Sequence, residues 1–116
     1  MALVMGNYPT TRDSQGEQAN PGTSTVMADT GTLKQGIYEV LVIASASADA
    51  QMVIQHRDAA NTGNVGDNVV FYVSGGGPVE VRGRFDINLA DERFRVMMDN
   101  ALTGDAVATI FAWRVG

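Results

Sequence analysis

The stretch "VEVRGRFDINL", residues 79–89, alternates between apolar and polar side chains along its whole length. Successive side chains of a β-strand point to opposite faces, so this pattern predicts a strand with one buried and one solvated face. Gly83 stands on the apolar side, where we expect a bulge or a bend in the strand. The solvated face would carry Glu80, Arg82, Arg84, Asp86 and Asn88.

The same period of two recurs on both sides of this stretch. It is found in "IYEVLVIASASADA" (37–50), "MVIQHR" (52–57), "ERFRVMM" (92–98) and "AVATIFAWRVG" (106–116), and "NVVFYV" (68–73) is almost entirely β-branched and aromatic. Nowhere do apolar residues recur at helical spacing over three turns. The sequence therefore predicts an all-β fold, an antiparallel β-sandwich or jelly roll of about seven or eight strands with an extended N-terminal arm.

The arm is predicted from residues 6–25, "GNYPTTRDSQGEQANPGTST", which are rich in Pro, Gly and polar residues and nearly free of apolar ones. We assign residues 1–30 to an N-terminal arm or linker and residues 31–116 to the β-sandwich domain. The apolar tip in front of the arm is either a short strand or frayed terminus, or a segment that docks on a neighbouring subunit. For such docking by strand addition we select Leu3, Val4, Met5 and Tyr8.

Charge and composition exclude several classes of protein. Eight basic residues against 13 acidic ones give a formal net charge of −5, which argues against a nucleic-acid partner. The absence of cysteine removes disulfides and thiolate chemistry. No apolar stretch approaches the roughly 18 residues of a membrane-spanning helix, and the start lacks the basic region of a secretory signal.

The one histidine, His56, lies in "VIQHRDAAN" (53–61) and invites an enzymatic interpretation. A kinase catalytic loop would need Asn five residues after Asp58, where this chain has Gly63. A Ser hydrolase would need a nucleophile elbow, and a calcium site would need acidic residues at loop spacing; neither is present. We therefore expect His56 at the end of a strand beside a turn, and we predict no catalytic residue, no metal, no cofactor and no enzyme activity.

Three carboxylates, Asp86, Asp91 and Glu92, allow a glycosidase as an alternative, because two carboxyl groups across a cleft can hydrolyse sugars. They stand beside one expected hairpin loop among arginines. This favours a solvated turn in which they pair with their neighbours.

Four arginines fall on one outer face if residues 79–89 and 92–98 form a hairpin, namely Arg82, Arg84, Arg93 and Arg95. They would either pair across the strands with nearby carboxylates or form a docking patch for an acidic protein surface. Phe111 and Trp113 have a similar double interpretation, as core residues or as anchors of a subunit interface.

Taken together, the phrases "QHRDAAN" and "ALTG" and the β-pattern of residues 31–116 resemble the small jelly-roll cement (decoration) proteins on the capsids of tailed bacteriophages. The resemblance implies a structural protein that forms a homodimer or homotrimer and binds the major capsid protein. It would bridge capsomers on the virion exterior after synthesis in the bacterial cytoplasm. An open alternative is a tail or receptor-binding β-sandwich domain that recognises glycan or host protein, for which the sequence offers Tyr72 and scattered Asp and Asn residues.

Overall fold

The computed structural model describes residues 10–116, so Leu3, Val4, Met5 and Tyr8 lie outside it and their predicted docking stays a prediction. The described chain is all-β, as predicted, and contains no helix that could cross a membrane. Its nine strands are β1 (Thr11–Asp13), β2 (Gln18–Ala19), β3 (Val26–Asp29), β4 (Gly36–Ala46), β5 (Ala50–Arg57), β6 (Val69–Val73), β7 (Val79–Ile87), β8 (Arg93–Met98) and β9 (Asp105–Arg114).

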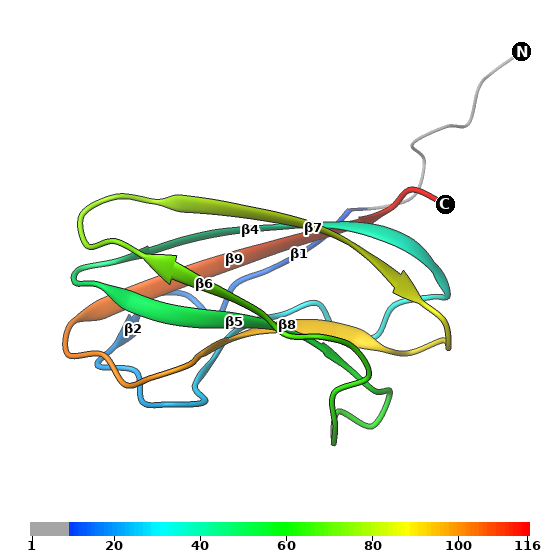
Figure 1. Ribbon diagram of the computed structural model, residues 1–116, viewed down its shortest axis with the longest axis horizontal. Helices are drawn as coiled ribbons and strands as arrows, with labels where there is room; N and C mark the ends of the chain where they lie inside the picture. Colours follow the sequence, from blue (N-terminus) through cyan, green and yellow to red (C-terminus); the bar gives the residue numbers. More distant parts are fainter. Residues whose placement is uncertain (1–9) are drawn as a thin grey trace, which may run out of the picture.

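The strands form two antiparallel sheets packed face to face as a sandwich (Figure 1). Sheet A has the order β1-β9-β4-β7, with β2 also paired to β9, and sheet B has the order β3-β8-β5-β6. The long central strands of sheet A are β4 and β9, whose pairing runs without interruption from Tyr38 opposite Arg114 to Ala46 opposite Ala106.

Residues 11–29, which the sequence assigned to an arm, contribute three strands to the sandwich. β1 and β2 pair with β9, and β3 pairs with β8. Backbone hydrogen bonds satisfy the short strands β1 and β2 without any apolar run, and β3 adds only the brief apolar run Val26 to Ala28, which is why composition did not reveal these strands. The predicted boundary after residue 30 therefore does not separate the sheets from what precedes them.

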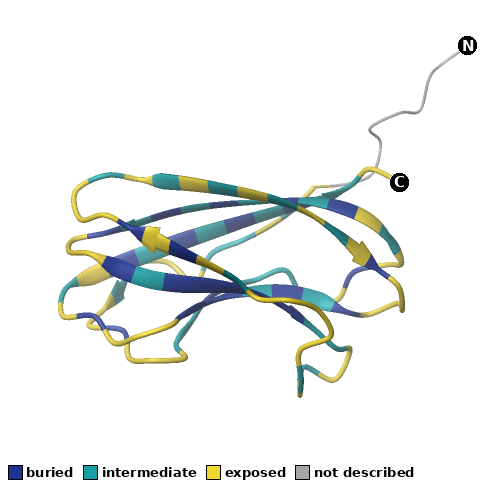
Figure 2. Ribbon diagram, viewed as in Figure 1, coloured by how far each residue is buried: buried dark blue, intermediate teal, exposed yellow. Residues whose placement is uncertain are grey.

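Both inner faces are buried (Figure 2). Sheet A presents a mixture of alanines and larger side chains such as Val40 and Ile110 from β4 and β9, and sheet B presents mainly large side chains from β3, β5 and β8. Buried alanines of sheet A are Ala44, Ala46, Ala106, Ala108 and Ala112, and the large buried side chains of sheet B include Met27, Met52, Ile54, Phe94 and Met98. Together these side chains form one hydrophobic core between the sheets.

Three rings connect the sheets at one end of the core. Phe94 of β8 lies with its ring centroid 4.9 Å from that of Phe85 of β7 and 4.9 Å from that of His56 of β5. A Cβ atom at Gly83 would come within 2.7 Å of the Phe85 ring, so glycine makes room for that ring. β7 keeps its register with β4 through Gly83, and the bulge expected there does not form.

The expected hairpin of residues 79–89 and 92–98 does not form, because β7 belongs to sheet A and β8 to sheet B. The connection between them crosses from one sheet to the other. Consequently Arg82 and Arg84 lie on the outer side of sheet A, while Arg93 and Arg95 lie on the outer side of sheet B. The prediction of a single four-arginine face is wrong, since alternation fixes the face of a strand but not its partner.

The stretch "VIQHRDAAN" does leave its sheet into a turn, after Arg57. The Asp58 carboxylate accepts hydrogen bonds from the Thr62 amide at 2.8 Å and the Thr62 hydroxyl at 3.0 Å, and the Asp58 amide donates to the Gly63 carbonyl at 3.0 Å. Asn61 takes a left-handed conformation in this turn, with φ of 58°. The turn thereby fixes the position of the Asn61 side chain over sheet B.

His56 itself points inward, and its partner comes from a distant turn. Its Nε2 atom lies 2.9 Å from Oε1 of Glu92, and the two residues are only 7% and 5% exposed. Two backbone hydrogen bonds hold this turn in place. The Leu33 amide donates to the Glu92 carbonyl at 2.9 Å, and the Asp91 amide donates to the Leu33 carbonyl at 2.8 Å. The interpretation of Glu92 as a solvated turn residue is wrong, and the pair closes the polar end of the core.

Replacing Glu92 with Ala should lower the free energy of unfolding by about 3 kcal/mol, because it leaves the buried His56 imidazole without its partner. Glu92→Gln, which keeps an oxygen acceptor for His56, should lower the free energy of unfolding by less than Glu92→Ala does. Urea unfolding at pH 7 measures both, with the exposed strand residue Glu80→Ala as the matched control. Equal stability of Glu92→Ala and the wild type would contradict a stabilising pair.

The turn at Asp58 should depend on pH. Hydrogen bonds from Thr62 to its carboxylate, above all from the Thr62 amide, lower the pKa of Asp58 below its ordinary value. A depressed pKa means that the carboxylate stabilises the turn above the pKa of the unfolded chain and that this contribution is lost as the pH falls through the folded pKa. An NMR titration should show the Asp58 carboxyl and the Thr62 amide changing together below about pH 4, and an unshifted midpoint would contradict the hydrogen bonds.

Candidate ligand-binding face

The outer side of sheet B carries an exposed aromatic ring toward the start of β5 and a network of amides and guanidinium groups toward its end. We call it the polar face and define it by Gln51, Gln55 and Arg57 of β5, Val70 and Tyr72 of β6, Arg93 and Arg95 of β8, and Asn61, Asn64 and Asn68 of the loop that follows β5. This loop hangs below the sandwich at the lower right of Figure 1.

Tyr72 is the most exposed large apolar residue on this face, at 72%, and Val70 beside it is 46% exposed. Gln51 stands directly opposite Tyr72 in the strand register and donates from its side-chain amide to the Asp99 carboxylate. An exposed ring next to fixed hydrogen-bonding groups offers both an apolar surface and orienting polar contacts to a ligand.

Asn61 is the centre of the polar network. Its Oδ1 atom accepts from Nε of Arg57 at 2.9 Å and from Nη1 of Arg95 at 3.4 Å. Nε of Arg95 also donates to Oε1 of Gln55 at 2.7 Å. Nη1 of Arg57 donates to Oδ1 of Asn64 at 2.9 Å, and the Asn64 amide donates in turn to Asn68 at 3.1 Å.

The network fixes these planar side chains before any ligand arrives, which lowers the entropic cost of binding. Partial burial lowers the pKa of Arg95, and the positive charge of nearby Arg57 lowers it further, although an arginine keeps its charge at neutral pH. Arg95 and Tyr72 were among the residues that the sequence singled out, whereas Arg57, Gln51 and Gln55 were not. Gln51, Gln55 and Arg57 share one signal in the sequence. They occupy odd-numbered positions of residues 51–57 and therefore point to the face of β5 opposite the one that carries His56.

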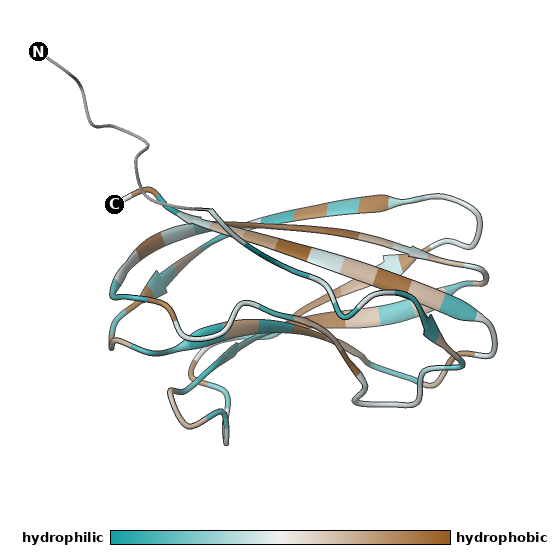
Figure 3. Ribbon diagram, turned by 180° about the vertical axis from the view of Figure 1, so that it is seen from behind, coloured by the Kyte–Doolittle hydropathy of each residue, from teal (hydrophilic) through white to brown (hydrophobic). Residues whose placement is uncertain are grey.

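The outer side of sheet A, here the apolar face, differs in character. Half-buried apolar side chains line it along β4 and β9, and Figure 3 shows hydrophobic segments along much of β9. Phe111 and Trp113 point to this side, away from the core, so the core interpretation of these two residues is wrong. The apolar residues of this face are Ile37, Leu41, Ile43, Val107, Phe111 and Trp113.

Arginines flank the apolar face. The guanidinium carbon of Arg12 lies 5.8 Å from the centre of the Phe111 ring, and Arg84 binds Glu39 with Nη2 at 2.6 Å and Nε at 2.9 Å from one carboxylate oxygen. Arg82 is exposed on the outer edge strand opposite Leu41. The predicted interface role of Arg82, Arg84, Phe111 and Trp113 stays a prediction.

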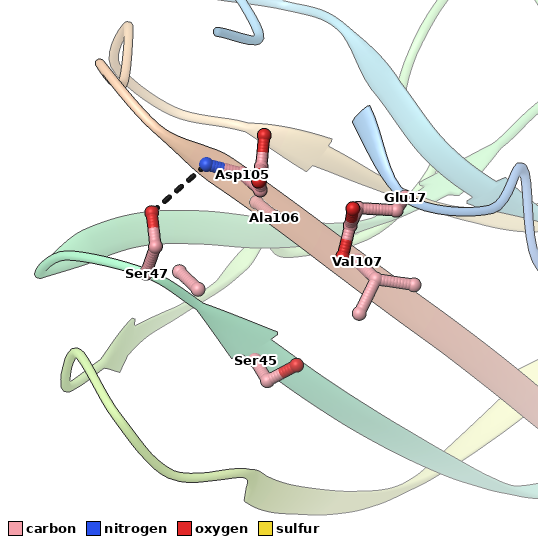
Figure 4. Close-up of a pocket in the computed structure, with 7 residues that line it drawn as sticks. Glu17, Ser45, Ser47, Asp105, Ala106 and Val107 are labelled. Atoms are coloured by element: carbon pink, nitrogen blue, oxygen red, sulfur yellow. Dashed lines mark hydrogen bonds between the residues drawn. The ribbon is translucent and has the colours of Figure 1, made fainter. Parts of the chain in front are cut away.

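A cavity of about 150 Å³ opens where the apolar face ends at the start of β9 (Figure 4). Two carboxylates, Glu17 and Asp105, and two hydroxyls, Ser45 and Ser47, line it. The Ser47 hydroxyl accepts a hydrogen bond from the Asp105 amide at 2.9 Å. Between residues 10 and 116, no three His, Cys, Asp or Glu side chains come together in a way that could hold a metal ion.

No family model and no curated protein sequence matches this chain. Solved structures with the same fold include the CBM22-1–GH10 modules of Clostridium thermocellum endo-1,4-beta-D-xylanase 10B in complex with xylohexaose, with a TM-score of 0.61 and 13% identity. That match covers 95% of this chain but 25% of the xylanase chain. The CBM22-1 xylan-binding domain of Paenibacillus barcinonensis Xyn10C matches with a TM-score of 0.59 and 11% identity, over 96% of this chain and 85% of that domain.

The structure of BiXyn10A CBM1 without ligand (apo) matches with a TM-score of 0.57 and 11% identity, over 92% of this chain and 97% of that one. At these identities the likeness concerns the arrangement of the strands. The chain therefore has the β-sandwich fold of these modules.

Proposed function

We propose that this chain is a non-catalytic β-sandwich module that binds glycan through the polar face. The observation that carries the proposal is one outer face that holds the exposed Tyr72 ring beside the Gln51 amide and, farther along β5, amide and guanidinium groups that are already hydrogen-bonded in place. A pyranose ring has one apolar C–H face that can lie on an aromatic ring, and hydroxyl groups around its rim that need donors and acceptors. The fold shared with xylan-binding modules supports this choice of ligand.

A non-enzymatic role also agrees with the placement of the titratable groups. His56 is turned into the core and bound to Glu92, so it does not reach a ligand on either outer face. Asp86 lies in β7 and Asp91 in the turn before β8, and both, unlike Glu92, are exposed. Because Glu92 is buried against His56, it is not available as one of a pair of hydrolytic carboxylates, which favours binding over hydrolysis at this connection.

Tyr72→Ala should weaken glycan binding about tenfold, because it removes about 1–2 kcal/mol of ring contact from the complex. Leu89→Ala is the matched control, since Leu89 is 70% exposed on the connection between the sheets and outside the polar face. A glycan array followed by isothermal titration calorimetry of the best ligand measures both variants. An equal loss of affinity in the two variants, or no binding to any glycan, would contradict glycan binding by the polar face.

The second candidate is the cement protein of a phage capsid, bound to the major capsid protein as a homodimer or homotrimer on the virion exterior. The resemblance of residues 31–116 favours it, and the apolar face with Phe111 and Trp113 offers the kind of aromatic and arginine-flanked surface that protein interfaces use. The two functions use opposite sides of the sandwich. They are therefore separable by mutation.

If the apolar face binds capsid, Trp113→Ala should reduce attachment to capsids at least tenfold while leaving glycan binding unchanged, because a buried Trp anchor is commonly worth about 2 kcal/mol or more at an interface. Quantitative mass spectrometry of purified particles measures the number of copies per shell protein. A near-integral ratio would support the cement function. Absence of the chain from particles, or full attachment by Trp113→Ala, would argue against it.

A further inference from the structure

The polar face carries more arginine side chains than the nearby carboxylates can neutralise. Arg57 of β5 stands directly opposite Arg93 of β8 and diagonal to Arg95. Like charges in directly opposed positions destabilise a pair of strands. A chain with a net charge of −5 has thus placed three positive groups on one small area of sheet B.

The two carboxylates near this cluster are already engaged. Oδ1 of Asp29 lies 3.3 Å from Nε of Arg93 and also accepts from the Gly31 amide at 2.7 Å. Asp58 is bound to Thr62 in the turn. Within residues 10–116, neither Arg57 nor Arg95 has a carboxylate oxygen within 4.0 Å.

Arg57 and Arg95 instead donate to neutral amide oxygens. Both reach the same atom, Oδ1 of Asn61, so the two guanidinium groups converge on one point. Of the five N–H groups of each guanidinium, the described hydrogen bonds of Arg57 use three and those of Arg95 use two, which leaves donors on both. An anionic oxygen beside Asn61 would meet two positive charges at a place already shaped for an acceptor.

We propose that the glycan bound by the polar face is acidic, and that Arg57 and Arg95 together hold the carboxylate of a uronic acid residue while Tyr72, toward the other end of β5, packs on a sugar ring farther along the same oligosaccharide. This proposal rests on the proposed glycan-binding function and adds the chemical class of the ligand. Arg57 and Arg95 are the residues that select the charged sugar, and Gln55 and Asn61 position them through their hydrogen bonds.

The test compares oligosaccharides of galacturonic and glucuronic acid, each as the free acid and as the methyl ester, by isothermal titration calorimetry. The ester keeps the shape of the sugar and removes its charge. The free acids should bind at least tenfold more tightly than their esters. Arg57→Gln and Arg95→Gln should each weaken binding of the acid roughly 10- to 100-fold and leave binding of the ester nearly unchanged, because only the acid makes charge-assisted bonds.

Arg82→Gln is the matched control, since it removes the same charge from an exposed strand position on the opposite side of the sandwich and should change neither affinity. Thermal unfolding of each variant reports whether the fold is kept. An independent measurement needs no variant: raising the NaCl concentration should weaken binding of the acid to the wild-type protein and leave that of the ester unaffected.

The outcomes separate this proposal from the function on which it rests. Equal affinity for acid and ester, or preference for neutral glycans on the array, would overturn the acidic specificity while leaving glycan binding in place. A preference for sulfated over carboxylated sugars would overturn the assignment of a carboxylate. Tighter binding of polyglutamate than of any glycan would identify an acidic protein partner, and failure of all glycans to bind would overturn both proposals.

Discussion

The sandwich depends on one hydrophobic core packed between its two inner faces. Alanines of β4 and β9 share this core with the long side chains of Met27, Met52 and Phe94 from sheet B. Close packing of this kind is sensitive to a single added methylene group. The same constraint explains Gly83, whose missing side chain leaves the space that the Phe85 ring occupies.

At one end the apolar core gives way to a polar pair. His56 and Glu92 come from β5 and from the turn before β8, 36 residues apart, and each satisfies the other where water is excluded. The Phe94 ring packs against the imidazole, so the pair is continuous with the three rings that join the sheets. A residue that looks catalytic in the sequence therefore has a structural position in the core.

The outer faces are made from the same strands as the core, because alternate residues of β4, β5, β8 and β9 point outward. On sheet A the outward residues are apolar and aromatic with arginines at the margin, a composition typical of protein interfaces. On sheet B they are amides and guanidinium groups held by a loop, with one exposed tyrosine, a composition typical of sites for polar ligands. A single small domain thereby presents two surfaces of different chemistry on opposite sides.

The sequence by itself determined the all-β class, the strands from residue 36 onward and the turn after Arg57, because period-two alternation and turn residues are local signals. Only the tertiary structure decided that β7 and β8 belong to different sheets, that residues 11–29 complete the sheet edges, and that Glu92 meets His56. These depend on pairing between distant segments, and alternation says which way a side chain points but not what it meets. For the same reason, Arg95 could be named from the sequence, whereas its convergence with Arg57 on Asn61 needed the folded chain.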